Sequence, residues 1–447
     1  MEVEKSLFSI QVGSGIYIWN CCRLDVYQHL LQLYGIEFAT SSLPRTNLVR
    51  SIVSRLKNQL WLRYILIRRP KFIFVTAQRV AIGNSIVDII SDHLMLQVTP
   101  NVVAIELLNR RSCNLLRMLL GLNTRIPPVF TTRNKQYFLN DVNSTINKAI
   151  YDYFDVSLDV SNIIACSLAK YQANYKFFAK LYTHFRPYAI IGVNDNTLFG
   201  LYAASKDFGV PTIELQHGAS NENTLLWSYP RSIESSHVGL SLPTAYLTFS
   251  DYWRNNTHYP VGISRSIGND SLYLDIIPSK SKGLLVVSAY MYYNSLLRLS
   301  MDLSPLVDIP IYFKLHPHEY RRKSETISFL KCHKNITVIS DDYSFSELFE
   351  LCDYVVVVHS SMAYQALQAG KSVCIYKISN YFWHSDIFDF VHLFETPTGL
   401  LDIISGHLLL SANSNHPNRP PLLYAPFDAS AFKLAVNELI APDYIEI

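Results

Sequence analysis

Several features that would place a protein in a specialised class are missing from this sequence. No uninterrupted apolar segment approaches the roughly 18–20 residues of a membrane-spanning helix. The beginning, MEVEKSLFSI, has acidic residues and lacks the basic head and long apolar run of a signal peptide. No internal repeat and no low-complexity tract interrupts the chain. We therefore expect a soluble or peripheral protein that stays inside the cell.

Cysteine occurs seven times, but never in a metal-binding or redox spacing. No two cysteines form a CxxC pair, and none has a histidine at the distance typical of a zinc site. Cys352 and Cys374 lie in or beside apolar, strand-like runs, where buried free thiols are common. The pattern favours a reducing cytoplasm over a disulfide scaffold, and it predicts no metal site.

A strong charge of one sign is also missing. Lys and Arg number 39 and Asp and Glu 36, so the formal net charge is only +3. This value argues against a nucleic-acid-binding protein on bulk charge. The length of 447 residues exceeds the usual size of one domain, and a hydrophobic content of 49% supplies apolar material for two cores. We therefore expect two domains.

What the sequence does contain is a series of short apolar runs that alternate with longer helical patterns. The runs are continuous in Val, Ile and Leu, as in strands buried on both faces of a parallel sheet. The segments between them are mostly long enough for crossover helices, so we predict an α/β protein with doubly wound sheets. The predicted strands lie at 71–77, 188–195, 211–218, 283–289, 311–317, 335–340, 353–361 and 372–377.

A stretch rich in Ser, Gly, Asn and Lys, GISRSIGNDSLYLDIIPSKSK at 262–282, precedes a new predicted strand. It marks a boundary between an N-terminal domain, residues 1–265, and a C-terminal domain, residues 280–447. Two doubly wound, Rossmann-like domains that face each other would place a ligand cleft between the carboxyl ends of their strands.

Two predicted strands of the C-terminal domain end in residues suited to phosphate. Ser360 and Ser361 follow YVVVV and precede the helical pattern MAYQALQAG, so one of them is expected to cap that helix. A helix start offers backbone N–H groups and the positive end of a dipole. The segment IYFKLHPHEY ends its strand at His316-Pro317, where a histidine can donate to a phosphate or a developing negative charge. The alternatives are a plain helix cap and a structural turn.

The motifs of the C-terminal third follow one another in a fixed order. A predicted strand ends in His-Pro, a second strand and a capped helix come next, and a further strand ends in Ser-Ser before another helix. The capped helix begins at Ser344, three residues before Glu347. Over about residues 283–377 this order resembles the nucleotide-binding domain of GT-B glycosyltransferases with paired HP and SS motifs. These families are the bacterial sialyltransferases and polysialyltransferases, the Kdo transferases and the CDP-glycerol glycerophosphotransferases.

The resemblance implies a donor site for a cytidine nucleotide. His316, Pro317, Ser360 and Ser361 would hold its phosphate, without a metal or other cofactor. Many UDP-sugar GT-B enzymes have a glutamate in the following helix that binds the ribose. This helix has glutamines, at 365 and 368, and no carboxylate, a departure that favours the cytidine nucleotide.

The segment RPYAIIGVNDNTLFGLYAASKDFGVPTIELQHGAS resembles the last βαβ portion of a GT-B acceptor domain. Such a domain must supply a general base, because the acceptor hydroxyl loses its proton as it attacks. His217, as in the HG motif of the CDP-glycerol enzymes, and Asp195, at the end of the preceding strand, are the candidates. Glu214 is a candidate acid. Alternatively, Asp195 caps the helix at 196–208 and His217 orders a turn. The D/E-D/E-G motif of classical sialyltransferases has no good match.

Residues 38–87 contain no Asp or Glu, whereas residues 45–71 carry eight Lys and Arg. Leucine or isoleucine recurs at every fourth position from 48 to 60, as in a helix with one apolar stripe. A basic amphipathic helix binds anionic membrane surfaces, so this segment predicts peripheral membrane association. The alternative is an ordinary solvated helix face. A nucleic-acid-binding role is disfavoured, since no recognised module accompanies the charge.

These inferences together predict a cytoplasmic, metal-independent, inverting GT-B glycosyltransferase on the inner face of the cell membrane. It would act in capsule or O-antigen polysaccharide biosynthesis. The expected partners are a donor such as a CMP-sialic acid-like sugar or CMP-Kdo, a lipid-linked or growing glycan acceptor, and the anionic membrane surface, but no nucleic acid. Three alternatives remain: a transferase of glycerol or another alditol phosphate from a CDP donor, a transferase whose donor has a UDP or GDP nucleotide, and an inactive GT-B scaffold that binds glycan.

Overall fold

The computed structural model divides the chain into two compact units, described here one at a time. Unit 1 comprises Met1–Thr248, Thr257–Ile267 and Asp428–Ile447, and unit 2 comprises Phe249–Asn256 and Gly268–Phe427. The structure describes residues 7, 11–12, 16–33, 62–76, 80–82, 85–98, 101–106, 125–126, 140–193, 198–224, 227–234, 241–340, 343–378, 381–410 and 420–440.

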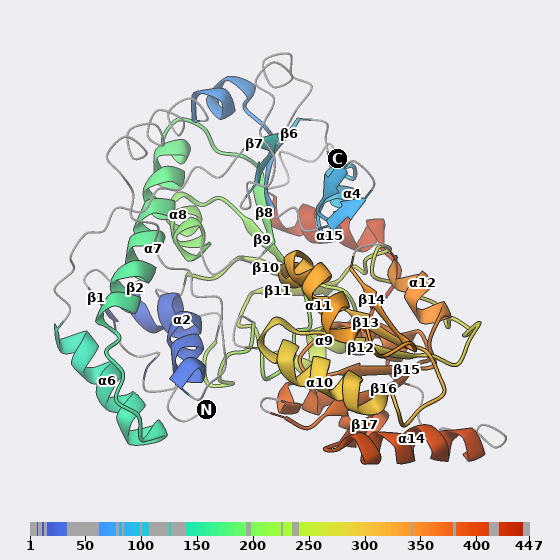
Figure 1. Ribbon diagram of the computed structural model, residues 1–447. Coiled ribbons are helices and arrows are strands. Elements are labelled where there is room, and N and C mark those ends of the chain that lie inside the picture. The colour runs from blue at the N-terminus through green and yellow to red at the C-terminus, as the bar shows by residue number, and fades with distance from the viewer. Residues whose placement is uncertain are drawn as a thin grey trace. The chain divides into compact units, whose positions relative to one another are not determined.

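Unit 1 is built on a parallel sheet with the strand order β11-β10-β9-β8-β3-β6-β7. The chain runs outward from β3 to β6 and β7, returns to β8 beside β3, and continues in the other direction to β11 (Figure 1). The strands are β3 (Phe72–Thr76), β6 (Val102–Glu106), β7 (Arg125–Ile126), β8 (Ala189–Val193), β9 (Thr212–Leu215), β10 (Ala245–Thr248) and β11 (Ile263–Ser266).

The main helices of unit 1 are α2 (Ile18–Leu33), α6 (Asn140–Phe154), α7 (Ser161–Tyr182) and α8 (Phe199–Phe208). Helix α7 packs against both α2 and α8. Gly200 in α8 permits this close approach, since a Cβ atom there would lie 2.0 Å from the carbonyl oxygen of Tyr171. Helix α8 ends at Gly209, whose φ of 67° is the left-handed conformation that glycine adopts without strain. The short elements are β1 (Gln11–Val12), β2 (Ile16–Tyr17), β4 (Val80–Ile82), β5 (Ser85–Val87) and α4 (Asp92–Met95).

Unit 2 contains a parallel sheet with the strand order β14-β13-β12-β15-β16-β17 (Figure 1). In order of sequence this is 3-2-1-4-5-6, the order of the Rossmann fold. The strands are β12 (Leu284–Val287), β13 (Ile311–Lys314), β14 (Ile336–Ile339), β15 (Tyr354–Val357), β16 (Ser372–Tyr376) and β17 (His392–Phe394). The helices are η1 (Tyr290–Tyr292), α10 (Tyr293–Leu303), η2 (Pro317–Arg322), α11 (Lys323–Leu330), α12 (Phe345–Glu350), α13 (Met362–Gln368), η3 (Tyr381–Phe390) and α14 (Pro397–Leu410), with η denoting 3-10 helices.

Both faces of this sheet are buried. Leu284, Val286 and Phe313 point to one side and form a core with α10 and α14. Their strand neighbours, such as Leu285 and Val287, point to the other side and are equally buried, and α13 packs on β15 and β16. Continuous apolar runs are thus explained by burial on two faces, and the predicted α/β class with two doubly wound sheets is confirmed. That the two sheets face each other across a cleft stays a prediction.

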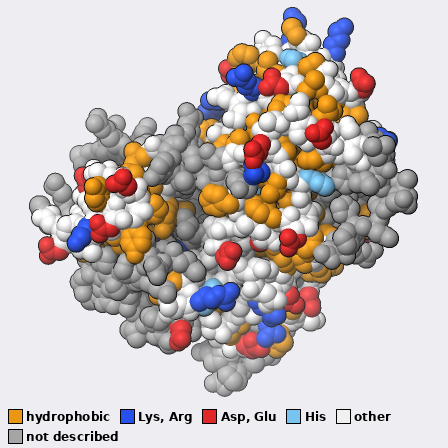
Figure 2. Space-filling model, turned by 90° about the horizontal axis from the view of Figure 1, so that it is seen from below, with side chains coloured by type: hydrophobic (Ala, Val, Ile, Leu, Met, Phe, Trp, Pro, Cys, Tyr) orange, Lys and Arg blue, Asp and Glu red, His pale blue; other side chains and the backbone are white. Residues whose placement is uncertain are grey.

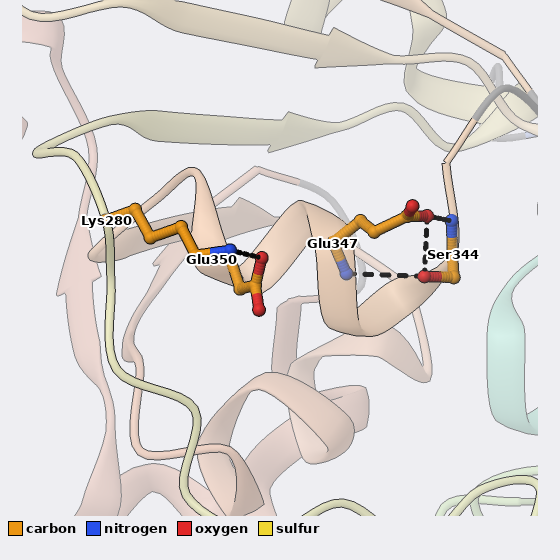
Figure 3. Close-up of polar contacts among 4 residues, drawn as sticks. All are labelled: Lys280, Ser344, Glu347 and Glu350. Carbon is orange, nitrogen blue, oxygen red and sulfur yellow. Dashed lines mark hydrogen bonds and ion pairs between the residues drawn. The ribbon is translucent and has the colours of Figure 1, made fainter.

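The predicted helix cap at Ser344 is also confirmed (Figure 3). The Glu347 backbone N–H donates to Ser344 Oγ (3.3 Å), and the Ser344 N–H donates to Glu347 Oε2 (2.7 Å). This reciprocal pair satisfies two N–H groups at the start of α12. The nearby ion pair of Lys280 and Glu350 is exposed and contributes little to stability. On the face drawn in Figure 2, acidic and basic side chains of the described residues are interspersed, in keeping with the small net charge.

The structure differs from the predicted domains, 1–265 and 280–447, in how the chain is partitioned. The chain passes between the units at four places, after residues 248, 256, 267 and 427. Helix α15 (Ala429–Leu439) belongs to unit 1, where it packs on β11 and Glu438 accepts a hydrogen bond from Arg265 (2.7 Å). Helix α9 (Asp251–Asn256) belongs to unit 2. Neither assignment is visible in local composition, because both depend on packing between distant segments.

Candidate functional site

The carboxyl edge of the unit 2 sheet has a topological switch point. Strands β13 and β14 follow β12 on one side, and the chain then returns to place β15 on the other side of β12. Ligands of open α/β sheets bind at the carboxyl ends of the strands where the order reverses. The loops that leave β12, β13 and β15 bring Ser288, His316 and the Ser360-Ser361 pair to this edge. Strands β13 and β15 flank β12, so their ends lie roughly 10 Å apart.

His316 is held as a neutral hydrogen-bond donor. The His318 backbone N–H donates to His316 Nδ1 (3.2 Å), so Nδ1 carries no proton and Nε2 carries it. Burial, assisted by the charges of His318 and Lys314, lowers the pKa of His316 to about 4. Pro317 begins η2 and fixes the backbone directly after the histidine. An uncharged imidazole that presents Nε2–H is suited to donate to a phosphate oxygen.

Glu319 stabilises the turn at His316 through a hydrogen bond to its backbone. Its side chain is completely buried, and Oε2 accepts the His316 backbone N–H (2.8 Å). Burial raises the pKa of Glu319, while the hydrogen bond from the His316 N–H acts in the opposite direction. Glu319 therefore fixes the backbone at the end of β13. Sequence reasoning did not single it out, because a glutamate within HPHEY has no local pattern that distinguishes it from a surface residue.

The two serines after β15 have different roles. Ser360 is half-buried, and its Oγ accepts the backbone N–H of Met362 (3.3 Å) at the start of α13. Ser361 occupies the N-cap position, makes no capping bond with its side chain, and is exposed. A serine therefore does cap the helix start, as predicted, and it is the Ser360 hydroxyl. Helix α13 has only seven residues, so the predicted help from its dipole is small, and the polar groups of the loop remain as the donors.

The two glutamines of α13 do not offer a ribose contact. Gln365 is 3% exposed. Gln368 Nε2 donates to the carbonyl oxygens of Leu274 (3.0 Å) and Tyr424 (2.9 Å), and its Oε1 accepts the Tyr424 N–H (2.6 Å). Helix α13 thus places neither a carboxylate nor an uncommitted amide where a nucleotide ribose would need one.

In unit 1 the structure describes one of the two predicted base candidates. His217 follows β9 and is half-buried, with its ring 4.7 Å from the ring of Trp227 in an edge-on contact. Gln216 Nε2 donates to the Gly218 carbonyl (2.7 Å), which fixes the turn on both sides of the histidine. Asp195 lies outside the described residues. The N-cap residue of α8 is Leu198, so this helix begins later than the predicted 196–208.

Glu214 is not an accessible acid. Its side chain is completely buried and accepts three hydrogen bonds, from Trp227 Nε1 (2.6 Å) and the hydroxyls of Tyr202 (3.1 Å) and Tyr259 (2.7 Å). Burial, together with the Glu214 charge, raises the pKa of both tyrosines well above the usual value. The candidate role of Glu214 as the acid is therefore wrong: alternation along β9 turns it into the core, where it holds Trp227 beside His217.

The described part of the chain contains neither a cluster of metal-ligating side chains nor a helix that could span a membrane. Among those residues, no group of three or more His, Cys, Asp or Glu side chains is arranged around a common point as metal ligands would be. The described cysteines are free thiols. No helix within the described ranges combines the length and apolar character needed to cross a bilayer.

No protein-family model and no curated protein matches this chain. Among solved structures it is similar to MurG of Acinetobacter baumannii, with 11% identity, a TM-score of 0.46, and coverage of 83% of this chain and 99% of that one. It is also similar to UDP-GlcNAc 2-epimerase from Neisseria meningitidis bound to UDP-GlcNAc (11% identity, 82% and 98% covered, TM-score 0.48). A glycosyltransferase from Rickettsia africae gives 13% identity, 82% and 92% coverage and a TM-score of 0.40. These likenesses carry no argument about the reaction, which rests on the residues of the two units.

Proposed function

We propose that this chain is a GT-B glycosyltransferase in which unit 2 binds the nucleotide of the donor and unit 1 activates the acceptor. The observation that carries the proposal is the convergence of neutral donors at the switch point of unit 2. The Nε2–H of His316 and the Ser360-Ser361 loop lie at the ends of β13 and β15, on either side of β12. Hydroxyl, imidazole and backbone N–H donors are the groups that hold a phosphate leaving group.

The reaction is a single displacement with inversion. The acceptor oxygen forms a bond to the anomeric carbon, and the bond from that carbon to the nucleotide phosphate oxygen breaks. The electron pair leaves with the phosphate, whose oxygens accept hydrogen bonds from His316 and the serines. The acceptor proton passes to His217 as general base. Asp195 remains the second candidate for that base.

For the donor we propose a cytidine nucleotide linked to a sialic acid-like sugar or to Kdo. Support comes from α13, which offers no carboxylate for a ribose and whose glutamines are buried or bound to backbone groups. The N. meningitidis epimerase, by contrast, was solved with UDP-GlcNAc, so a uridine nucleotide is the first competitor to test. The acceptor in this proposal is a lipid-linked or growing surface glycan of capsule or O-antigen biosynthesis.

We also propose that the enzyme is cytoplasmic and binds the anionic inner face of the membrane through residues 45–71. Residues 45–61 lie outside the described ones. The helix at 62–68 buries Leu62 and Ile65 and exposes Arg63, and Ile67 is 81% exposed. An exposed isoleucine beside exposed arginines combines apolar and cationic contacts with a lipid surface.

Thermal-shift titration with CMP, CDP, UMP, UDP, GDP and AMP tests the nucleotide site. A ligand that binds only the native state stabilises it by RT ln(1 + [L]/Kd), or about 2.7 kcal/mol at 100 times Kd. We expect the largest shift with a cytidine nucleotide. His316→Ala should raise its Kd roughly tenfold, the loss of about 1.4 kcal/mol of hydrogen bonding to a charged group. His333→Ala, before β14 and so at the opposite edge of the sheet, is the control and should bind normally.

The possible results separate the candidate functions. A uridine or guanosine preference would leave a transferase but refute the cytidine donor. Tight CMP or CDP binding would require product analysis, since a transferase of alditol phosphate from a CDP donor, with His217 as base, also releases CMP. No shift with any nucleotide would indicate an inactive scaffold instead.

A further inference from the structure

A buried histidine in the short helix η3 contacts the loop that follows β15. The backbone of η3 kinks at His384 (φ −99°, ψ 19°), whose side chain is completely buried. His384 Nε2 accepts the backbone N–H of Ser360 (3.4 Å) across a sequence separation of 24 residues. Nothing in the local sequence, YFWHSDIFDF, distinguishes this histidine from an ordinary core residue.

The hydrogen bond fixes the tautomer of His384. Because Nε2 accepts an N–H, the ring proton lies on Nδ1. Burial lowers the pKa of His384 well below the usual value, and the neighbouring His359 lowers it further. The imidazole is therefore neutral, and its Nε2 holds the backbone N–H directly after His359.

Helix η3 is itself anchored on two sides. Asp386 Oδ1 accepts the hydroxyl of Tyr364 in α13 (2.8 Å), and its Oδ2 accepts the hydroxyl of Tyr252 in α9 (2.7 Å). The ring of Trp383 lies 4.2 Å from the ring of His359 in the loop. The support for the loop after β15 is therefore connected to two other helices of unit 2, and His384 is the point where it contacts the loop backbone.

We propose that His384 is a positioning residue of the nucleotide site, which holds the backbone at Ser360 so that Ser360 and Ser361 are presented to the donor phosphate. The inference rests on the proposed function for its ligand, but the contact that carries it is internal to unit 2. Within the loop, Ser360 Oγ is committed to Met362, so this bond orients the serine relative to α13. The His384 bond orients the same serine relative to the end of β15.

Two substitutions separate hydrogen bonding from packing. In His384→Gln, the amide oxygen can accept the Ser360 N–H in place of the imidazole nitrogen. In His384→Leu, the site stays filled but the hydrogen bond to Ser360 is lost. With the nucleotide that stabilises the wild type most, we expect the Kd of His384→Leu to rise at least about tenfold and that of His384→Gln to stay within about threefold. All titrations are made well below the lowest melting temperature.

Leu400→Ala provides the control for loss of stability alone. Leu400 in α14 is completely buried against the opposite face of the sheet, so its truncation should lower the melting temperature without changing Kd. Hydrogen exchange of the segment 358–361 without ligand should be faster in His384→Leu, and close to wild type in His384→Gln and Leu400→Ala.

Equal affinity of wild type and His384→Leu, or an equal loss in both His384 variants, would overturn the positioning role. Unchanged exchange at 358–361 in His384→Leu would overturn it as well. If the wild type binds no nucleotide, the proposed function fails instead, and the exchange measurement still decides whether His384 holds the loop.

Discussion

Histidines 316, 359 and 384 all lie at or beside the carboxyl edge of unit 2, and burial lowers the pKa of each. A histidine in water has a pKa of about 6.5, so none of these three relies on positive charge near neutral pH. For His316 and His384 the contribution to the proposed anion site is directional, because one ring nitrogen of each accepts a backbone N–H. This explains how buried imidazoles can serve such a site without the cost of burying a charge.

Acid sensitivity of the fold follows from the same groups. Burial lowers the pKa of His359 to about 4, below its value in the unfolded chain. Between the two values the unfolded state binds more protons, so the stability due to this group is present above about pH 6.5 and is lost as the pH falls towards 4. Each such histidine contributes a slope of up to about 1.4 kcal/mol per pH unit.

We expect the melting temperature of the wild type to fall between pH 7 and pH 4.5, and that of His359→Phe to fall less. Phenylalanine keeps an aromatic ring against Trp383 but cannot take up a proton. Scanning calorimetry at both pH values makes the comparison. If the variant keeps the full pH dependence of the wild type, His359 is not one of the groups responsible.

Individual site residues could be predicted from the sequence where they directly follow a recognisable element. Residues that act through contacts with distant segments could not. His316 and Ser360 were predicted because each follows a continuous apolar run. Glu319, Glu214 and His384 owe their roles to packing, and no local pattern marks them. Glu214 shows the same limit: alternation along β9 explains why its side chain points into the core, but not the three donors that bind it there.

The helix at 62–68, which is the described part of the basic segment 45–71, permits a direct test of membrane binding. Arg63 is exposed and Ile67 is 81% exposed on the helix at 62–68, so Glu at both positions should leave the fold intact. Each cation near an anionic surface contributes about 1 kcal/mol. Arg63→Glu with Ile67→Glu should therefore weaken binding to phosphatidylserine-containing vesicles at least about tenfold in a co-sedimentation assay.

The matched control is Arg298→Glu with Ile327→Glu, which also replaces an exposed arginine and an exposed isoleucine, in helices α10 and α11 of unit 2. Its vesicle binding should equal that of the wild type. Equal losses in both pairs would point to general charge rather than to this helix, and no loss in the first pair would contradict the membrane assignment.

Predicting elements was easier than predicting their ends. All eight apolar runs contain strands, from β3 to β16. Apart from the partly exposed edge strand β14, these strands are mostly buried, and a strand buried on two faces must be apolar throughout. The polar ends of the runs, such as His316 and the two serines, belong to loops instead. In the two large sheets, strands β6, β7, β11 and β17 were not predicted: β7 has only two residues, and β11 and β17 are partly exposed strands at sheet edges.

An unexpected feature of the whole molecule is that each unit includes a segment distant in sequence from the rest of it. Residues 249–256 belong to unit 2, and residues 428–447 belong to unit 1. Trp253 in α9 is completely buried in unit 2, where Nε1 donates to the Leu423 carbonyl (2.5 Å) and the ring lies 4.8 Å from that of Tyr364. Trp227 is an equally large side chain that is 2% exposed in unit 1. The pair therefore allows each unit to be destabilised by the same chemical change.

Removing a buried tryptophan side chain costs about 3–5 kcal/mol. Trp253→Ala should therefore accelerate hydrogen exchange in peptides from β15 and β16, although it lies ahead of the predicted C-terminal domain in sequence. Trp227→Ala should accelerate exchange in β8 and β9 and leave β15 and β16 nearly unchanged. The reverse pattern for Trp253→Ala would return α9 to unit 1 and remove the crossings after residues 248 and 256. The expected pattern would mean that deleting residues 249–256 weakens unit 2, because those residues supply part of its core.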